Sequence, residues 1–419
     1  MLDDSLSELI AASLIKLHVR VLFGVVGIPV TEIAEACISK GIQFIGFRNE
    51  QSASYAAAAY GFLTATPGVC LTVSGPGMIH ALAGISNAWS NCWPLIVISG
   101  SSDSRSRGGF QECPQVEAAA MFVKRSFQIE QAVDVPDLLQ RAYNVAISSR
   151  PGPVYIDLPG DVISMKCDAS SVAALSHMKL PVIPKSMADP KDLVKAADLL
   201  KKAKRPLIIV GKGAAYGKAE MAIRKLVEKS NFPFLATPMA KGVVSDSDPH
   251  CVSAARSFAL QHADCILLLG ARLNWMLHFG QPPRFSKDVC VIQVDICAEE
   301  MTANTNSLVG DCSLIVEGLN EKLEGYSFPS QNEWWNRLKL KCSQNNQIVR
   351  KMMDSTESPM DYYSAYKIIT LFVKQDDFIS AEGANTMDIG RTLLLNSLPR
   401  HRLDAGTFGT ISFFQFCFP

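Results

Sequence analysis

The sequence predicts an α/β protein built from parallel sheets that are covered by helices on both faces. Apolar runs alternate along the chain with stretches of helical periodicity, first at 21–26, 44–47, 69–73 and 95–99. These runs are apolar throughout, as in strands that are buried on both faces. Glycine-rich corners follow several of them, at the point where sheets of this class bind ligands. Repeated strand–helix–strand units therefore imply parallel pairing.

Composition limits the classes of function. At 419 residues the chain should hold two or three domains, and 48% hydrophobic with 19% charged residues is ordinary for large cores. Forty basic and forty acidic residues cancel, so no overall field favours nucleic acid or a membrane surface. No run has the length and apolarity of a membrane span, and the start lacks the basic residues of a signal peptide. Twelve scattered cysteines indicate reduced core thiols of an intracellular protein.

The first predicted domain covers residues 1–165. Its expected helices are 3–18, 30–40, the alanine-rich stretch after Asn49, and a helix that ends at Asn91. Its expected strands are 21–26, 44–47, 69–73, 95–99 and 154–158. The segment 101–112 is rich in Ser and Gly and is expected to be a loop.

Glu50 lies at the corner between a predicted strand and the alanine-rich helix. Asn49 is a good N-cap, and alanine combines high helix propensity with little bulk, so this helix can approach neighbouring backbone closely. A carboxylate in the first helical turn can simply complement the helix dipole. The corner is also where ligand-binding groups of such sheets are found. Both interpretations of Glu50 are open from these residues alone.

Two further α/β units are predicted beyond a linker at 166–190. The central unit, 191–326, is expected to contain a helix at 191–204 and strands at 207–210, 265–269 and 289–294. A connecting segment at 327–359, helical to about Met353, leads to the third unit, 360–419. There we expect a helix at 360–373, a strand at 378–380 and a loop at 382–385.

Several motifs occur in one order along about four hundred residues. They are Gly24-Val-Val-Gly-Ile-Pro29, Arg48-Asn-Glu50, Ser74-Gly-Pro-Gly77, Arg150-Pro-Gly-Pro153, Gly270-Ala-Arg-Leu-Asn-Trp275, Glu382-Gly-Ala-Asn385 and Asp404-Ala-Gly-Thr-Phe-Gly-Thr410. In this order they resemble the thiamine-diphosphate (ThDP) enzymes, most closely the 2-hydroxyacyl-CoA lyases, with the oxalyl-CoA decarboxylases as close relatives.

The resemblance implies three-layer α/β domains of the ThDP-enzyme type. Residues 1–165 would bind the pyrimidine of ThDP, 191–326 would form a Rossmann-like central domain, and 360–419 would begin the diphosphate-binding domain. That third domain is expected to be incomplete, because residues 411–419 diverge from the family pattern. The motif that supplies the Mg²⁺ ligands is missing from this chain, so no metal-binding residue is assigned. We therefore expect a truncated form that is inactive alone.

The resemblance also assigns roles to individual residues. Glu50 would be catalytic, hydrogen-bonding to the aminopyrimidine of ThDP and so promoting loss of the thiazolium proton. The diphosphate would meet Gly383, Ala384, Asn385, Gly409 and Thr410. Phe110 and Gln111 would lie over the reacting end of the cofactor; oxalyl-CoA decarboxylases tend to carry Tyr-Glu there, which favours the lyase.

The central domain of oxalyl-CoA decarboxylase holds ADP or the nucleotide part of CoA. By that resemblance the residues that would bind ADP or CoA here are Arg150, Lys212, Arg272 and Asp295. From the residues alone, Gly211-Lys-Gly213 is as consistent with an ordinary turn, and strand-end Arg and Asp also cap helices or form ion pairs.

The implied reaction is cleavage of a 2-hydroxyacyl-CoA, in fatty acid α-oxidation, to formyl-CoA and a shortened aldehyde. The implied assembly is a homo-oligomer, a dimer or tetramer, with each active site between subunits. Location in peroxisomes is implied too, although Cys417-Phe-Pro419 is not a peroxisomal tripeptide and predicts a cytosolic form. The alternatives are a non-catalytic partner subunit, a misfolding product, an oxalyl-CoA decarboxylase and an enzyme similar to acetolactate synthase.

Overall fold

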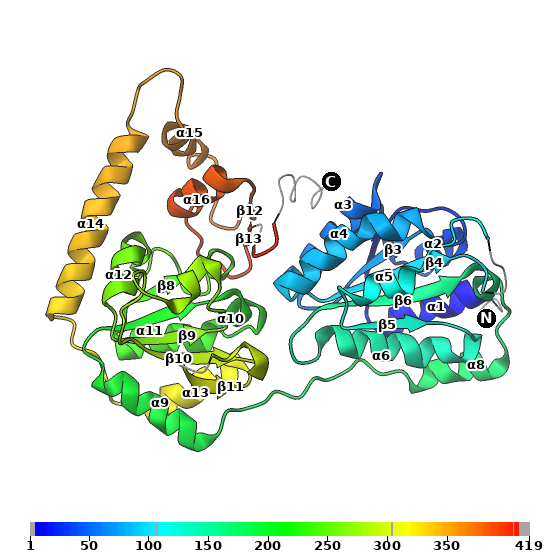
Figure 1. Cartoon of the computed structure of the whole chain (residues 1–419), viewed down its shortest axis with the longest axis horizontal. Helices are drawn as coiled ribbons and strands as arrows, with labels where there is room; N and C mark the ends of the chain where they lie inside the picture. The colour runs from blue at the N-terminus through cyan, green and yellow to red at the C-terminus, as the bar shows by residue number, and fades with distance from the viewer. Residues whose placement is uncertain (1–4, 105–107, 303–304, 405, 410–419) are drawn as a thin grey trace. The chain divides into compact units, whose positions relative to one another are not determined.

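The chain folds into two compact units, drawn in Figure 1. The computed structural model describes residues 5–104, 108–302, 305–404 and 406–409. One unit is built on the chain up to residue 184 together with 407–409, and the other on residues 185–406. Thr410 and the segment 411–419 lie outside the described residues, so the prediction of a divergent tail is not addressed by the structure.

The first unit contains a six-stranded sheet in the order β2-β1-β3-β4-β6-β5. Every neighbouring pair is parallel, as the strand–helix alternation predicts. The strands are β1 (Val21–Gly24), β2 (Gln43–Gly46), β3 (Gly68–Thr72), β4 (Leu95–Ser101), β5 (Arg125–Gln128) and β6 (Pro153–Pro159). The strand order reverses between β1 and β3, which is the topological switch point of this sheet.

Helices cover both faces of this sheet. Leu22, Val69 and Ile96 point into one apolar layer with α1 (Leu6–Lys16), α2 (Thr31–Ser39) and α6 (Val135–Ile147). The other face carries α3 (Glu50–Thr64), α4 (Pro76–Asn91) and α5 (Gln115–Ala120), as Figure 1 shows. The alanines of α3 are buried almost all round the helix, so the predicted close packing is confirmed. Short helices α7 (Gly160–Ile163), α8 (Ala169–Ala174), η1 (Ala132–Asp134) and η2 (Leu175–His177) complete the unit.

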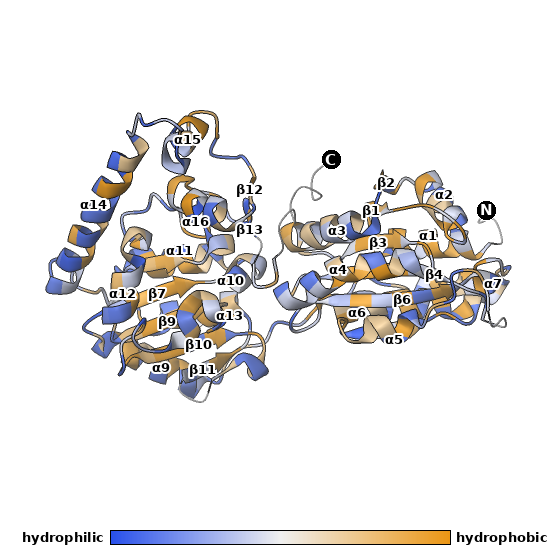
Figure 2. Cartoon of the chain, turned by 45° about the horizontal axis from the view of Figure 1, so that its top comes forward, coloured by the Kyte–Doolittle hydropathy of each residue, from blue (hydrophilic) through white to orange (hydrophobic). Residues whose placement is uncertain are grey.

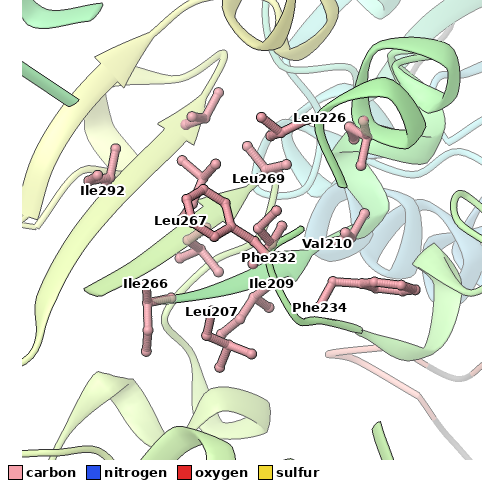
Figure 3. Packing of buried hydrophobic residues seen from close by; sticks show 14 of the residues in the cluster. Leu207, Ile209, Val210, Leu226, Phe232, Phe234, Ile266, Leu267, Leu269 and Ile292 are labelled. Carbon is pink, nitrogen blue, oxygen red and sulfur yellow. The ribbon is translucent and has the colours of Figure 1, made fainter. Parts of the chain in front are cut away.

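The second unit contains a five-stranded parallel sheet in the order β11-β10-β9-β7-β8. Its strands are β7 (Pro206–Val210), β8 (Phe234–Ala236), β9 (Cys265–Leu269), β10 (Cys290–Asp295) and β11 (Thr305–Val309). The strands are among the most apolar parts of this unit (Figure 2). Figure 3 shows side chains of β7 and β9 packed with Phe232 and Phe234, all of them buried.

Helices again surround the sheet of the second unit. They are α9 (Pro190–Lys202), α10 (Lys212–Tyr216), α11 (Glu220–Ser230), α12 (Arg256–His262) and α13 (Cys312–Lys322). The 3₁₀ turns are η3 (Pro238–Ala240), η4 (Ser253–Ala255), η5 (Trp275–Gly280) and η6 (Ala298–Glu300). The long helix α14 (Glu333–Met353) is fastened at its start, where the buried Trp334 Nε1 donates to the Pro206 carbonyl at 2.9 Å.

A third, smaller group of elements belongs to the same second unit. Helices α15 (Tyr362–Ile369) and α16 (Ala384–Leu393) pack beside a parallel pair of short strands, β12 (Ile379–Ala381) and β13 (Arg402–Asp404). The predicted fold class of parallel α/β layers is thus confirmed. The predicted domain boundaries remain predictions; the stretch expected to be a linker, 166–190, contains α8 and η2.

None of the helices in the described ranges combines the length and apolarity needed to cross a membrane.

Candidate functional site

Glu50 is the first residue of α3, directly beyond the carboxyl end of β2. The preceding Asn49 is extended, and its Oδ1 accepts a hydrogen bond from the Gln51 amide at 2.7 Å. This is the N-cap geometry that the sequence predicts, and it fixes the direction in which the first turn of α3 leaves the sheet. Glu50 therefore has a defined backbone position at the carboxyl edge of the six-stranded sheet.

The Glu50 side chain is nearly buried, with Glu50 only 7% exposed. Its Oε2 lies 3.2 Å from Nδ1 of His80, a half-exposed residue in the second turn of α4. Its Oε1 faces Gly77, where an added Cβ would lie 3.0 Å from that oxygen and 2.5 Å from Cγ2 of Val73. Gly77 therefore lets α4 approach the carboxyl group closely, since a larger residue would clash with Val73 and Glu50. The site thus offers a shielded carboxyl at a tightly packed glycine corner.

The sequence did not predict that His80 contacts Glu50. The two residues are 30 positions apart, and nothing in their spacing pairs them. A usable signal exists, because His80 follows the Gly75-Pro76-Gly77 corner by one helical turn. A residue there faces the same sheet edge as the corner itself.

The loop that carries Phe110 and Gln111 reaches the same corner. Ser74 Oγ donates to Gln111 Oε1 at 2.8 Å, and the Gln111 carbonyl oxygen lies 2.5 Å from where a Cβ on Gly75 would be. Gln111 has a positive φ of 59°, while Phe110 is 79% exposed. The structure therefore brings Gln111 to the turn beside Glu50, and leaves the Phe110 ring in contact with solvent.

Gln115, the first residue of α5, anchors the Gly75 turn by hydrogen bonds. Its Oε1 accepts from the Gly75 amide at 2.9 Å, and its Nε2 lies 2.7–2.8 Å from the Gly100 carbonyl, the Tyr155 hydroxyl and Asp157 Oδ1. An amide nitrogen can donate to two of these three at once. Burial, followed by the charge of Asp157, raises the pKa of Tyr155, so its hydroxyl stays protonated and donates to Asp157. No sequence pattern marks this network, since its members come from the start of α4, from β4, from α5 and from β6.

Arg150 lies elsewhere in the first unit. It belongs to the connection between α6 and β6, and so to the amino edge of the sheet, opposite the edge that carries Glu50. Its carbonyl accepts from Lys124 Nζ at 2.8 Å, as do those of Val145 and Ser148. Lys124 thereby closes the turn that presents Arg150.

Three other predicted residues gather at one edge of the second unit. Lys212, Arg272 and Asp295 stand at the carboxyl ends of β7, β9 and β10, which are consecutive neighbours in the sheet. Lys212 is the first residue of α10 rather than part of a longer loop, and Asp295 is the last residue of β10. Asp295 Oδ1 accepts from the Cys297 amide at 3.0 Å. All three residues are partly exposed.

This edge is also the switch point of the second sheet. The strand order reverses between β7 and β9, so the loops that carry Lys212 and Arg272 flank it. The two loops touch through their backbones: the Gly213 amide donates to the Gly270 carbonyl at 3.0 Å. Gly270 has a φ of +61°, and an added Cβ would lie 2.5 Å from the Ala214 nitrogen, so only glycine fits.

The residues predicted for the diphosphate fall in both units. Gly383 has a φ of 79° and precedes α16, whose exposed first turn contains Ala384 and Asn385. The predicted loop 382–385 is therefore a helix N-terminus, where backbone amides and the helix dipole favour anions. Gly409 is exposed and belongs to the first unit, in which Asn87 Nδ2 donates to the neighbouring Phe408 carbonyl at 2.7 Å. Thr410 is outside the described residues.

Comparison with known proteins identifies the family. Residues 4–120 match the N-terminal TPP binding domain of thiamine pyrophosphate enzymes, and residues 193–319 match the central domain of the same enzymes. The chain is 48% identical over 412 residues to 2-hydroxyacyl-CoA lyase 1 of Homo sapiens, covering 97% of this chain and 71% of that protein. The chain belongs to the thiamine pyrophosphate enzyme family.

Further relatives place it on one branch of the family. 2-hydroxyacyl-CoA lyase 1 of Mus musculus is 50% identical over 412 residues, covering 97% of this chain and 71% of the relative. Oxalyl-CoA decarboxylase of Escherichia coli K12 is 40% identical over 414 residues, covering 96% of this chain and 73% of the relative. The predicted family and its cofactor, thiamine pyrophosphate (ThDP), are confirmed, and this branch consists of enzymes.

The observed sites fit the two ends of this cofactor. A shielded carboxyl beside the bare Gly77 corner suits a flat, hydrogen-bonding ring such as an aminopyrimidine. The exposed N-terminus of α16 suits a diphosphate. The role of each individual residue remains a prediction.

Proposed function

We propose that this chain performs the chemistry of a 2-hydroxyacyl-CoA lyase, cleaving a carbon–carbon bond of a 2-hydroxyacyl-CoA to give formyl-CoA and a shortened aldehyde. The observation that carries the proposal is the Glu50 carboxyl, which is almost fully shielded from water and lies against the tightly packed Gly77 corner. Shielding strengthens a hydrogen bond from a carboxyl group because water does not compete for it. The sequence relationship to lyases over nearly the whole chain supports the substrate class.

ThDP supplies the electron sink that stabilises negative charge at the cleaved carbon. The task of the chain is to bind and orient. Glu50 would hydrogen-bond to a pyrimidine ring nitrogen and hold the proton shared between them. Gln111, fixed by Ser74, could orient a substrate oxygen but cannot act as a base. The amides at 383–385 would bind the diphosphate, together with Mg²⁺ held by oxygen ligands.

An oxalyl-CoA decarboxylase is the second candidate, favoured by the 40% identity to the Escherichia coli enzyme. The pair Phe110-Gln111 separates the two candidates, since the decarboxylases tend to carry Tyr-Glu there. A substrate screen with 2-hydroxyacyl-CoA and oxalyl-CoA decides between them. Release of formyl-CoA and aldehyde from the first supports the lyase, whereas release of CO₂ from the second supports the decarboxylase.

Complementation tests the role of Glu50. In this family each active site lies between subunits, so we propose that the chain joins a homologous subunit. The chain is co-expressed with the full-length mouse lyase in which the residue aligned with Glu50 has been changed to glutamine. We expect formyl-CoA production to return, because Glu50 of this chain completes one site of each mixed oligomer.

The controls are Glu50→Gln and Glu35→Gln in this chain. Glu35 is an exposed glutamate on α2, so its change should leave the restored activity intact, whereas Glu50→Gln should abolish it. A mixed oligomer that forms but stays inactive would remove Glu50 from the mechanism. Failure to form any mixed oligomer would contradict the proposed association. Import of such oligomers into peroxisomes, followed by fluorescence, tests the location that the family resemblance implies.

We further propose that the switch-point edge of the second unit binds the adenosine diphosphate part of CoA. Lys212 and Arg272 would meet the phosphates, and Asp295, at the end of β10, would accept hydrogen bonds from the ribose. Calorimetry with ADP should show Lys212→Ala and Arg272→Ala binding at least tenfold more weakly. The matched control Lys225→Ala changes an exposed lysine on α11 and should bind normally. Equal affinity for ADP in the parent and all three variants would exclude this edge as the ADP-binding site.

A further inference from the structure

Two cysteines face each other across neighbouring strands of the second unit. Cys265 begins β9 and Cys290 begins β10, and the parallel register pairs the two residues directly. Adjacent strands lie about 4.8 Å apart and paired side chains share one face, which is within the Cα separation of about 4.4–6.8 Å found in disulfides. Within the described strands they are the one pair of cysteines that the register brings together.

The two thiols have different chemical characters. Cys265 hydrogen-bonds to the sulfur of Cys290, and Asn306 Nδ2 of β11 donates to the same sulfur at 3.4 Å. The Cys265 hydrogen bond, with the nearby charge of Lys195, lowers the pKa of Cys290 to about 7. The same contact together with burial raises the pKa of Cys265. Cys290 is thus the nucleophile of the pair at neutral pH, and Cys265 carries the proton.

The two cysteines also differ in their exposure to solvent. Cys290 is partly exposed at the amino edge of the sheet, whereas Cys265 is 3% exposed. A small oxidant can therefore reach one sulfur, and the second sulfur is already in contact with the first. An accessible thiolate next to a resolving thiol is the arrangement that favours disulfide formation over further oxidation.

We propose that Cys265 and Cys290 form a reversible disulfide when the protein meets a hydroperoxide. The Cys290 thiolate attacks one peroxide oxygen; the sulfur–oxygen bond forms as the oxygen–oxygen bond breaks, leaving a sulfenic acid and an alkoxide or hydroxide that takes up a proton. The Cys265 sulfur then loses its proton and attacks the Cys290 sulfur, and water leaves. Two thiols are oxidised by two electrons while the hydroperoxide is reduced to an alcohol or water. The proposal does not depend on the lyase function.

Peptide mapping of the 419-residue chain tests this proposal. The chain is treated with hydrogen peroxide, quenched with an alkylating agent and digested without reductant. We expect a linked peptide containing Cys265 and Cys290 that has lost two hydrogen atoms and disappears when a thiol reductant is added. Cys251→Ser removes a partly exposed thiol whose bridge partner, Phe234, is not a cysteine, and should give the same linked peptide.

A second measurement keeps the result independent of the folding of variants. In the untreated chain the alkylation rate of Cys290 should rise as pH passes through about 7, ahead of that of Cys265. In Cys265→Ser the peroxide should leave a sulfenic acid on Cys290 that a dimedone probe captures. Separate alkylation of both cysteines after peroxide treatment, in chain whose circular dichroism is unchanged, would overturn the proposal. A linkage to any other cysteine would overturn it as well.

Discussion

At the scale of single residues, the surroundings of the Glu50 carboxyl depend on one hydrogen-bonding side chain, His80, and on one residue without a side chain, Gly77. His80 contacts one carboxyl oxygen at 3.2 Å, and the bare Cα of Gly77 faces the other. The position of Glu50 follows from the sequence because Asn49 is a local cap signal. The His80 contact does not, since it depends on how α3 and α4 pack. At this site the sequence therefore predicts the local backbone structure, but it does not predict the contact between side chains of two helices.

Gly77→Ala tests how closely the neighbouring atoms pack beside the Glu50 carboxyl. The added methyl would lie 2.5 Å from Val73 Cγ2 and 3.0 Å from Glu50 Oε1, so neighbouring groups must move. Overpacking of this kind costs about 1–3 kcal/mol in unfolding free energy. Chemical denaturation should show that loss, and mixed oligomers should lose activity. Gly46→Ala is the control: its nearest atom would be 3.6 Å away, so stability within about 0.5 kcal/mol of the parent is expected. Equal stability of the two variants would show that the corner is not tight.

At the scale of elements, strands buried on both faces were the easiest to predict. The five apolar residues of β9 appear in the structure with the predicted bounds, because a continuous apolar run has few other uses. The strands β5, β8, β11 and β13 were missed. Three of them have only three or four residues, too few to show a period, and β11 begins with the polar residues Thr305, Asn306 and Ser307. Helix starts at Lys212 and Ala384 were taken for loops, since glycines on their N-terminal side suggested turns.

The short helix α5 supports the Gly75 corner through Gln115. Replacing Gln115 with Met keeps the length of the side chain but leaves the Gly75 amide without its partner, whereas the Gly100 carbonyl still accepts from Ser99 Oγ at 3.0 Å. An unsatisfied buried group costs about 1–3 kcal/mol, so a loss of that size in the free energy of unfolding is expected. Hydrogen exchange of the Gly75 amide should also accelerate.

The control for that substitution is Gln128→Met. Gln128 Nε2 also donates to Asp157, at 3.0 Å, but Gln128 is exposed, so water can replace the lost bond. Its unfolding free energy should change by less than about 1 kcal/mol. An equal loss of unfolding free energy in Gln115→Met and Gln128→Met would show that the hydrogen bond to the Gly75 amide does not stabilise this turn.

At the scale of the whole molecule, the chain is two folded units: it enters the second through 178–189, a stretch without helix or strand, and returns to the first at residue 407. The sequence predicts three strand–helix units, each with its own covering helices, and their boundaries remain predictions. The sequence could not show how the joining stretch is held. The backbone of Lys179 is bound by a distant side chain: its amide donates to Gln140 Oε1 at 2.9 Å, and Gln140 Nε2 donates to its carbonyl.

Limited proteolysis should therefore distinguish two parts of that stretch. Val182 is 91% exposed, and a protease that cleaves beside aliphatic residues, such as thermolysin, should first cut near it and give two stable fragments, the second of which still carries residues 407–409. Trypsin should spare the bond after Lys179, because a bound backbone cannot extend into a protease site. In Gln140→Ala that bond should become an early tryptic site, while thermolysin cleavage near Val182 keeps its rate. Early tryptic cleavage after Lys179 in the unaltered chain would show that Gln140 does not hold the segment in solution. First cuts inside α3 or β9 would show instead that the two units do not fold as separate bodies.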